Sequence, residues 1–337
     1  MIYGHGDDLF KYNNVEINFS TNIFNHFSHS GLFAFLGSSM ESITSYPEPA
    51  PISLEKAIAA RLGIGTDCIM ATNGATEAIY LIAQSLKDRV AHILQPTFAE
   101  YADACQMYGL ETRSISSLYD IGSLGNGDAV WLCNPNNPTG SGVDYDWLYD
   151  MIRRNPHTVF IIDQSYSAYT LKRTVSAEDA VELGNVLLIG SMTKDFGIPG
   201  IRLGYAVGGS RILARVRRWR MPWSVNALAM KAGIYLIEHR REYRIDAAAL
   251  CRERERVAEL IGGMGIKTFP SDSNMLLCEL PSQSAAALKE WLAREHGMLI
   301  RDASNFHGLS ERHFRIAVQT GDEDDKLIKA LRLWTAL

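Results

Sequence analysis

The sequence has 337 residues, of which 47% are hydrophobic and 21% are charged, and its formal net charge is -5. A chain of this length and apolar content can bury a large core, which excludes a disordered protein and a small domain that depends on disulfides. The slight excess of acidic residues also argues against a general attraction to nucleic acids or anionic membranes.

The first segment, residues 1–40, is polar and only weakly periodic, which predicts an arm that crosses between domains or onto a partner subunit. It shows no basic region followed by an apolar stretch, so no secretory signal is predicted. No run of about 18 apolar residues predicts a membrane span. The five cysteines form no C-x-x-C pair, which argues against a disulfide framework or a zinc knuckle. We therefore expect a cytoplasmic protein that binds neither membranes nor nucleic acids.

Short apolar runs alternate with helical patterns between residues 68 and 209. Runs that predict strands buried on both faces lie at 68–72, 90–95, 129–133, 158–163, 185–190 and 204–208. Helical patterns lie between them at 75–86, 99–109 and 145–154. Strands that alternate with helices predict an α/β fold, in which helices cover both faces of a mostly parallel sheet in three layers.

The pattern changes after residue 210. Residues 210–262 are almost entirely helical in character, and short strands then mix with helices at 284–295 and 322–335. This predicts a smaller α+β domain at the C-terminus. We expect a large domain over 41–225 and a small domain over 226–337, joined by the long helices of 210–262. The arginine-rich run within those helices is interleaved with acidic residues, which favours a solvated helix face over an RNA-binding surface.

Candidate functional residues follow successive strands, at the sheet edge where α/β proteins bind ligands. Gly74, Ala75 and Thr76 open a helix whose N-terminus can attract a phosphate, although an ordinary capped helix would look the same. Phe98 follows the next strand and can stack on a flat cofactor or simply pack in the core. Asn137 lies in a rigid loop with two prolines, which a simple turn would not need.

The last two strands of the series end near a carboxylate and a lysine. Asp163 ends a buried strand, where a carboxylate is costly unless it is paired with a cationic ring nitrogen, a metal or an arginine. Lys194 follows the next strand and is a candidate amine nucleophile, because burial frees its lone pair. Arg202, eight residues later, can bind a phosphate. Together these groups are those needed to hold pyridoxal phosphate.

The chain resembles the fold-type I pyridoxal-phosphate enzymes of the class I/II aminotransferase family. The resemblance rests on four motifs that occur in the family's order: NPNNPTG at 134–140, D-x-x-Y at 163–166, S-x-T-K at 191–194 and G-x-R-x-G-Y at 200–205. It spans nearly the whole chain. It implies a pyridoxal 5′-phosphate cofactor and a homodimer with shared active sites. It also implies a small phosphorylated amino compound as substrate. Independently of the resemblance, the histidines show no metal-ligand spacing, so no metal site is predicted.

The resemblance also implies roles for individual residues. Lys194 would form the Schiff base with the cofactor and shuttle protons, and Asp163 would pair with the pyridinium nitrogen. Asn137 and Tyr166 would hydrogen-bond the ring hydroxyl oxygen, and Phe98 would stack on the ring. The residues implied for the cofactor phosphate are Gly74, Ala75, Thr76, Ser191, Arg202 and, from the partner subunit, the residue equivalent to Tyr46.

Two subgroups with phosphorylated substrates are similar to this chain: threonine-phosphate decarboxylase of cobalamin biosynthesis and histidinol-phosphate aminotransferase. The segments His5-Gly6, 17–23 and 299–306 resemble the decarboxylase, although Phe24 stands where a proline is expected. We therefore prefer the decarboxylase and keep the aminotransferase as the alternative. A non-catalytic binding module is a remote third possibility. The predicted substrate-binding residues are Arg315, Arg301, Asn22 and His5.

Overall fold

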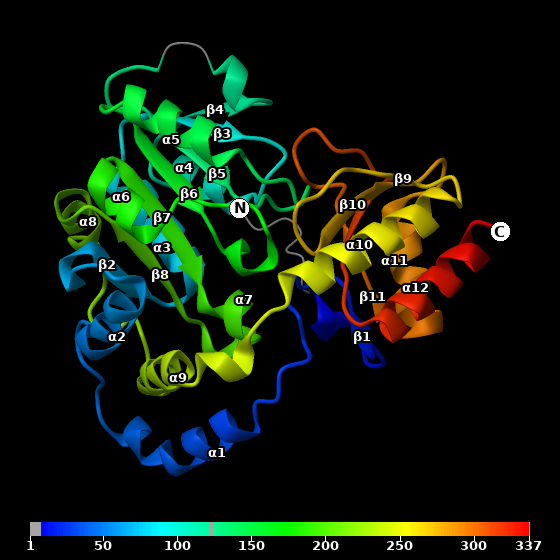
Figure 1. Ribbon diagram of the computed structural model, residues 1–337, viewed down its shortest axis with the longest axis horizontal. Helices are drawn as coiled ribbons and strands as arrows, with labels where there is room; N and C mark the ends of the chain where they lie inside the picture. The colour runs from blue at the N-terminus through cyan, green and yellow to red at the C-terminus, as the bar shows by residue number, and fades with distance from the viewer. Residues whose placement is uncertain (1–7, 122–123, 337) are drawn as a thin grey trace.

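A computed structural model describes residues 8–121 and 124–336 of the chain (Figure 1). The described residues form a large region around a seven-stranded sheet and a smaller region around a four-stranded sheet. Figure 1 shows the two regions side by side, with the strands of the large sheet stacked between helices. The α/β class with a smaller α+β region is therefore the fold predicted from the sequence.

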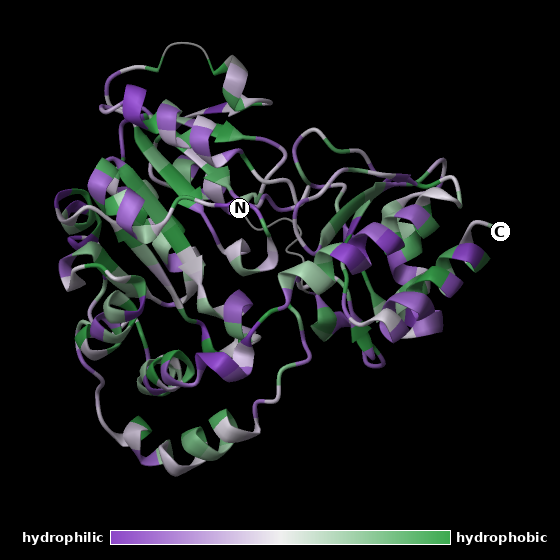
Figure 2. Cartoon of the chain, in the orientation of Figure 1, coloured by the Kyte–Doolittle hydropathy of each residue, from purple (hydrophilic) through white to green (hydrophobic). Residues whose placement is uncertain are grey.

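The large sheet is mostly parallel. Its strands, in spatial order, are β2 (Ile69–Thr72), β8 (Gly204–Gly208), β7 (Val186–Ser191), β6 (Val159–Asp163), β5 (Ala129–Cys133), β3 (Val90–Leu94) and β4 (Glu111–Ile115). Strand β8 runs antiparallel to both of its neighbours, whereas the other pairs are parallel. The central strands β5, β6 and β7 are buried along their whole length, and Figure 2 shows them as hydrophobic segments.

Helices cover both faces of this sheet. Three of them share one buried hydrophobic cluster with the strands: α3 (Gly74–Ser85), α4 (Glu100–Met107) and α8 (Ser210–Arg217). The helices that share the second cluster, on the opposite face, are α2 (Ile52–Leu62), α5 (Tyr145–Arg154), α6 (Ala177–Leu183) and α9 (Ala227–Glu238). This is the three-layer arrangement that the alternating pattern predicts, and it leaves the carboxyl ends of the strands free to build a site.

The small region packs helices on an antiparallel sheet. The sheet order is β12 (Arg301–Asp302), β13 (His313–Ala317), β10 (Met275–Glu279) and β9 (Lys267–Thr268). Its helices are α10 (Ala247–Gly262), α11 (Ala285–His296) and α12 (Gly321–Trp334). No helix among the described residues is long and apolar enough to span a membrane.

The N-terminal arm contacts both regions. Its strand β1 (Ile17–Asn18) pairs in parallel with β11 (Met298–Leu299) of the small region. Its helix α1 (Ser30–Ser38) contacts α9 and contributes a buried leucine to the large region's core. The arm therefore crosses between the two regions before the chain enters the large sheet.

The helical stretch 210–262, which we expected to join the domains, is broken into separate helices. Helix α8 contacts α3, β2 and β8 of the large region, and helix α9 contacts α2. Tyr243 of the turn η7 (Arg240–Tyr243) belongs to the hydrophobic cluster that α2 and α9 share. Helix α10 instead contacts α12 and β9 of the small region. We therefore propose a domain boundary just after η7, about twenty residues later than the predicted one at residue 226.

Candidate active site

A cavity of about 290 Å³ lies where the carboxyl ends of β6 and β7 face β12 and β13 of the small region. Of the residues that the sequence predicted, those that line this cavity are Asn22, Ala75, Thr76, Phe98, Asn137, Asp163, Tyr166, Ser191, Lys194, Arg202, Arg301 and Arg315. Gly74 lies beside it, against the guanidinium of Arg202. Tyr46 lies on the surface, and His5 is outside the described residues. Segments from across the chain thus converge on one site.

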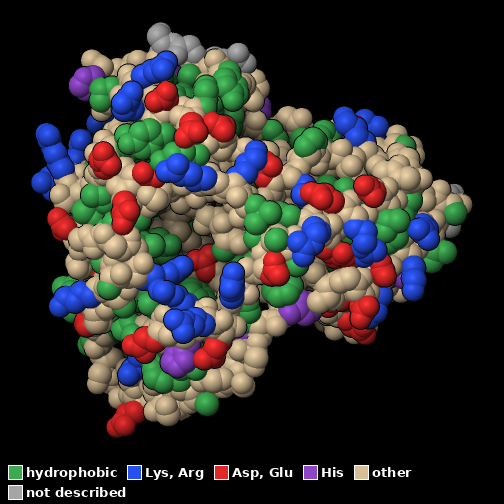
Figure 3. All heavy atoms as spheres, viewed as in Figure 1, with side chains coloured by type: hydrophobic (Ala, Val, Ile, Leu, Met, Phe, Trp, Pro, Cys, Tyr) green, Lys and Arg blue, Asp and Glu red, His purple; other side chains and the backbone are tan. Residues whose placement is uncertain are grey.

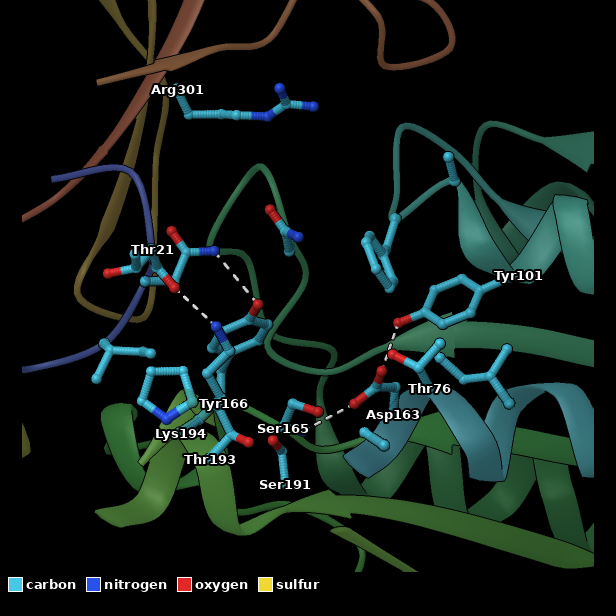
Figure 4. A pocket seen from close by; sticks show the side chains of 18 of the residues that line it. Thr21, Thr76, Tyr101, Asp163, Ser165, Tyr166, Ser191, Thr193, Lys194 and Arg301 are labelled. Carbon is cyan, nitrogen blue, oxygen red and sulfur yellow. Dashed lines mark hydrogen bonds between the residues drawn. The ribbon is translucent and has the colours of Figure 1, made fainter. Parts of the chain in front are cut away.

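Asp163 is held by two hydrogen bonds at the end of β6 (Figure 4). Its carboxylate accepts one from the hydroxyl of Tyr101 at 2.7 Å and one from the backbone N–H of Ser165 at 2.9 Å. Burial raises the pKa of Asp163, whereas these hydrogen bonds act in the opposite direction. No ion pair joins Asp163 to another described residue. The site therefore contains a buried carboxylate that a cationic group on a ligand would complement.

Lys194 lies in the short helix α7 (Met192–Phe196), which begins where β7 ends. Its Nζ donates a hydrogen bond to the carbonyl of Thr21 in the N-terminal arm, at 2.7 Å. The hydroxyl of Tyr169 donates to the backbone carbonyl of Lys194 at 2.8 Å and so fixes the helix that carries the amine. Figure 4 shows the lysine between the arm and Tyr166, on the same side of the cavity as Asp163.

The N-terminus of α3 lies beside Arg202, and together they form a candidate anion-binding site. Gly74 has a φ of +76°, and a Cβ at this position would overlap the guanidinium of Arg202. Gly204 of β8 lets the strand approach closely, because a Cβ there would lie 2.5 Å from the backbone nitrogen of Ala75. Backbone N–H groups at a helix N-terminus and a nearby guanidinium are a favourable environment for a phosphate.

Two buried arginines of the small region form the cavity wall opposite Asp163 and Lys194. Arg301 of β12 and Arg315 of β13 are directly paired across the antiparallel ladder, so their side chains share one face of the small sheet. Arg315 donates to the side chain of Asn137 and to the carbonyl of Ser20, and Arg301 donates to Asn305 at 2.7 Å. Burial lowers the pKa of Arg315 to about 9, which leaves the guanidinium cationic at neutral pH. Figure 4 shows Arg301 across the cavity from Asp163 and Lys194.

Asn22, which was predicted to bind substrate, lines the cavity and is hydrogen-bonded to Tyr166. Its side-chain amide donates to the hydroxyl of Tyr166 at 3.3 Å, and its Oδ1 is buried with no hydrogen-bond partner among the described residues. Its φ of 55° turns the arm sharply into the cavity. An unsatisfied buried oxygen at this point is available to a ligand.

Several lining residues were not singled out from the sequence. Tyr101 looks like an ordinary buried residue of α4, although its spacing of three from Phe98 places both aromatics after the same strand. Thr21 acts through its backbone carbonyl, which no sequence pattern reveals. Asn305 and Phe306 follow Arg301 in a loop of the small region. Among residues 8–121 and 124–336, no group of three or more His, Cys, Asp or Glu residues could hold a metal ion.

Tyr46 lies outside the cavity. Its side chain is 86% exposed, and its ring lies 5.3 Å from that of Trp223 (centroid to centroid), which is itself exposed. Within a single chain, Tyr46 therefore does not reach the cavity. The predicted contact with a cofactor phosphate needs a second subunit and stays a prediction.

The donor set fits pyridoxal phosphate. A buried carboxylate without an ion-pair partner among the described residues complements a protonated ring nitrogen, and the Gly74–Arg202 cradle suits a phosphate. The Lys194 amine and the ring of Phe98 line the same cavity. Both ends of the cofactor thus have groups of the required chemistry.

Comparison with known proteins gives one consistent result. Residues 15–331 match the family model of aminotransferase class I and II. The chain is 30% identical over 307 residues to the threonine-phosphate decarboxylase of Salmonella typhimurium, covering 87% of this chain and 84% of that protein. It is also 30% identical over 308 residues to a histidinol-phosphate aminotransferase of Caldanaerobacter subterraneus subsp. tengcongensis, covering 86% and 84%. The crystal structure of L-threonine-O-3-phosphate decarboxylase from Porphyromonas gingivalis superposes with a TM-score of 0.91 at 34% identity, covering 95% of this chain and all of that one.

Proposed function

The chain belongs to the aminotransferase class I and II family of pyridoxal-phosphate-dependent enzymes, and from this premise we propose that it decarboxylates L-threonine O-3-phosphate. The observation that carries the proposal is the pair of buried arginines, Arg301 and Arg315, across the cavity from Lys194. Threonine phosphate has two anionic groups, a phosphate and a carboxylate. Two adjacent guanidinium groups can hold both anions of one substrate molecule. The similarity to two threonine-phosphate decarboxylases supports the same substrate.

We assign the cofactor contacts as follows. Lys194 would hold the cofactor through its amine and carry protons to and from the substrate, and Asp163 would stabilise the proton on the ring nitrogen. Phe98 would pack against the ring. Asn137 and Tyr166 would hydrogen-bond the ring hydroxyl oxygen, and Gly74, Ala75, Thr76, Ser191 and Arg202 would hold the phosphate. When bound, pyridoxal phosphate withdraws electrons from the substrate's α-carbon, which weakens the bonds at that carbon.

The arginines would then select the reaction. The bond that breaks at the α-carbon is the one aligned with the electron-withdrawing π system, so the orientation of the substrate decides between loss of CO₂ and loss of a proton. Arg301 and Arg315 bind the anionic groups and thereby set that orientation. Their positions are fixed by the ladder between β12 and β13, and Arg315 is held further by Asn137 and Ser20.

Histidinol-phosphate aminotransferase is the second candidate. It is supported by a relative with the same identity, 30%, as the decarboxylase. Histidinol phosphate carries a single anionic group, so in this reaction the second arginine would serve the carboxylate of the amino acceptor. Both candidates use the same cofactor contacts, and only the substrate side distinguishes them.

Product analysis tests the proposal. Purified enzyme loaded with pyridoxal phosphate is incubated either with threonine phosphate or with histidinol phosphate and 2-oxoglutarate. We expect CO₂ and aminopropanol phosphate in the first mixture and no reaction with Lys194→Ala. Glutamate formed only in the second mixture would replace the decarboxylase with the aminotransferase. A protein that purifies colourless and takes up no cofactor would favour the non-catalytic binding module.

We also propose that the enzyme is a cytoplasmic homodimer with shared active sites. Tyr46 and Trp223 are both exposed and their rings lie 5.3 Å apart, and Phe33, Ile43 and Met221 are further exposed apolar side chains. Adjacent exposed aromatic side chains such as Tyr46 and Trp223 are typical of subunit interfaces. All five cysteines are free and buried, which suits a reducing compartment.

A further inference from the structure

A second cavity, of about 860 Å³, lies on the face of the large sheet that α2 and α6 cover. Its walls come from the end of α2, the start of α6, strands β7 and β8, helix α7 and the turn η7. Figure 3 looks into a hollow on this face of the molecule and shows Lys or Arg side chains along its edge. The family assignment and the active site do not use this cavity.

The cavity has an excess of positive charge. Four arginines line it, Arg61 from α2 and Arg240, Arg241 and Arg244 from η7 and the residue after it, against two carboxylates, Asp195 and Glu178. None of the four guanidinium groups makes a hydrogen bond or an ion pair with any residue that the structure describes. They are therefore available to an anionic ligand. Several uncommitted guanidinium groups around one concave surface favour an anion with more than one charge.

The floor of the cavity is apolar. It consists of Leu188 and Val207 from the sheet and the aromatic rings of Phe196 and Tyr205. The ring of Phe196 is fixed edge-on against Tyr243, with a centroid distance of 5.8 Å. Arg61 lies near the Phe196 ring, with its guanidinium 5.9 Å from the ring centroid. An apolar floor below a cationic rim suits a ligand that has both an apolar or aromatic part and charged groups.

The second cavity shares its structural elements with the active site. Gln164, Gly190 and Asp195 line it, and each directly adjoins a residue of the active-site cavity, namely Asp163, Ser191 and Lys194. Gly190 and Ser191 are successive residues of β7 and point to opposite faces of the sheet. Asp195 follows Lys194 in α7, so this helix contributes to the walls of both cavities. Burial raises the pKa of Asp195 to about 6, and the nearby Arg61 acts in the opposite direction.

We propose that this second cavity is a binding site for an organic phosphate with at least two negative charges and an apolar or aromatic part, a class that includes nucleoside di- and triphosphates. The arginines of α2 and η7 bind the charged groups, and the apolar floor holds the remainder of the ligand. The site is separate from the substrate pocket, so the proposal does not depend on which reaction the enzyme catalyses.

Calorimetric titration of the enzyme loaded with pyridoxal phosphate tests the site. The probes are ATP, inorganic tripolyphosphate and adenosine. We expect saturable binding of ATP and of tripolyphosphate, with ATP binding more tightly because it also covers the apolar floor, and much weaker binding of adenosine. In the double variant Arg240→Ala/Arg241→Ala, the dissociation constant for ATP should rise roughly tenfold or more, because hydrogen bonds to charged groups typically contribute at least that factor.

The matched control is Arg153→Ala/Arg154→Ala on α5. These are also two adjacent, exposed arginines, and their ion pairs are with Asp150 at 3.9 Å and 3.5 Å. The control removes the same charge away from the cavity and should bind ATP as the unmodified enzyme does. The proposal is overturned if neither ATP nor tripolyphosphate binds saturably. It is also overturned if the two double variants have the same affinity for ATP.

Discussion

The most consequential contact in the site is the hydrogen bond between Tyr101 and Asp163. A buried carboxylate that must stay ionised needs donors that stabilise its charge, and Tyr101 supplies one of the two found here. Tyr101 is itself fully buried and stacks on Trp131. We therefore interpret Tyr101 as a positioning residue that acts on the cofactor through Asp163.

Removal of the Tyr101 hydroxyl should lower the activity of the enzyme without abolishing it. In Tyr101→Phe, Asp163 loses a donor to its charged form, so its pKa rises further above the ordinary value. We expect kcat to fall by about ten- to a hundredfold, as the loss of a hydrogen bond to a charged group costs about 1.5–3 kcal/mol. The fall in rate at low pH should also begin at a higher pH than in the unmodified enzyme. The measurement is the pH profile of kcat.

Tyr119→Phe is the control, because its side chain is 71% exposed and it lies outside the cavity. An unchanged pH profile in Tyr101→Phe, with only a lower thermal stability, would contradict the positioning role and leave a structural one.

At the level of residues, the strand pattern predicted the groups that follow strands, the family resemblance predicted Asn22, Arg301 and Arg315, and the backbone contact of Thr21 was missed. Asp163, Ser191 and Lys194 lie at strand ends, and the topology of a parallel sheet places such residues together. Thr21 reaches the site only because the N-terminal arm folds back over it. A backbone carbonyl and a long-range fold-back leave no pattern in the sequence, which is why this contact could not be predicted.

At the level of elements, most strands of the large sheet were predicted because they are continuous apolar runs. Strand β4 was missed, since its sequence ETRSI lies at the sheet edge and is mainly solvent-exposed. Periodicity alone also could not assign helix α9 to the large region. The apolar face of α9 packs beside α2, and only the tertiary contacts reveal this.

Glu55 ties helix α2 to strand β2 by a hydrogen bond and to the segment after α8 by an ion pair. Glu55 of α2 is 3% exposed, accepts a hydrogen bond from the backbone N–H of Ala71 at 3.1 Å, and pairs with Arg220. In Glu55→Gln the guanidinium of Arg220, whose side chain is 10% exposed, loses its counter-charge. We expect the free energy of unfolding to fall by about 2–4 kcal/mol, as measured by urea denaturation.

The matched change is Glu182→Gln on α6, an exposed glutamate. It should alter the free energy of unfolding by less than about 0.5 kcal/mol. If both variants unfold at the same urea concentration as the parent, the ion pair does not stabilise the large region.

A buried aspartate of α12, the helix that packs on α10, makes the stability of the protein depend on pH. Asp324 of α12 is fully buried, and burial, reinforced by the negative charge of Glu253 on α10, raises its pKa to about 8. An ordinary aspartate in the unfolded chain titrates near 3.8. Between these two values the folded state binds more protons than the unfolded state, so the free energy of unfolding falls as the pH rises from about 4 to 8.

Asp324→Asn should remove this dependence. The amide cannot ionise, and so the variant gains stability relative to the parent as the pH rises, by about 3–4 kcal/mol between pH 5 and pH 8. Urea denaturation of both proteins at the two pH values measures the difference. Parallel pH profiles for the parent and the variant would show that Asp324 is ionised throughout this range.

At the level of the whole molecule, the described chain gathers the cofactor groups into one cavity but leaves Tyr46 on the surface. The family resemblance implies that this tyrosine contacts the cofactor phosphate of a second subunit. In a two-fold symmetric dimer, each site would then combine Lys194 of one subunit with the Tyr46 position of the other. Such an arrangement has a consequence that separate sites would not have.

Two inactive variants should restore activity when they are mixed. Lys194→Ala lacks the amine, and Tyr46→Ala lacks the phosphate contact, so each homodimer is inactive at limiting pyridoxal phosphate. After the subunits are unfolded and refolded together, random assortment makes half of the dimers mixed, and one of the two sites in each mixed dimer is intact. We expect about a quarter of the unmodified activity per site, measured as CO₂ release. If the mixture is no more active than its components, each site is complete within one chain, and Tyr46 plays no part across an interface.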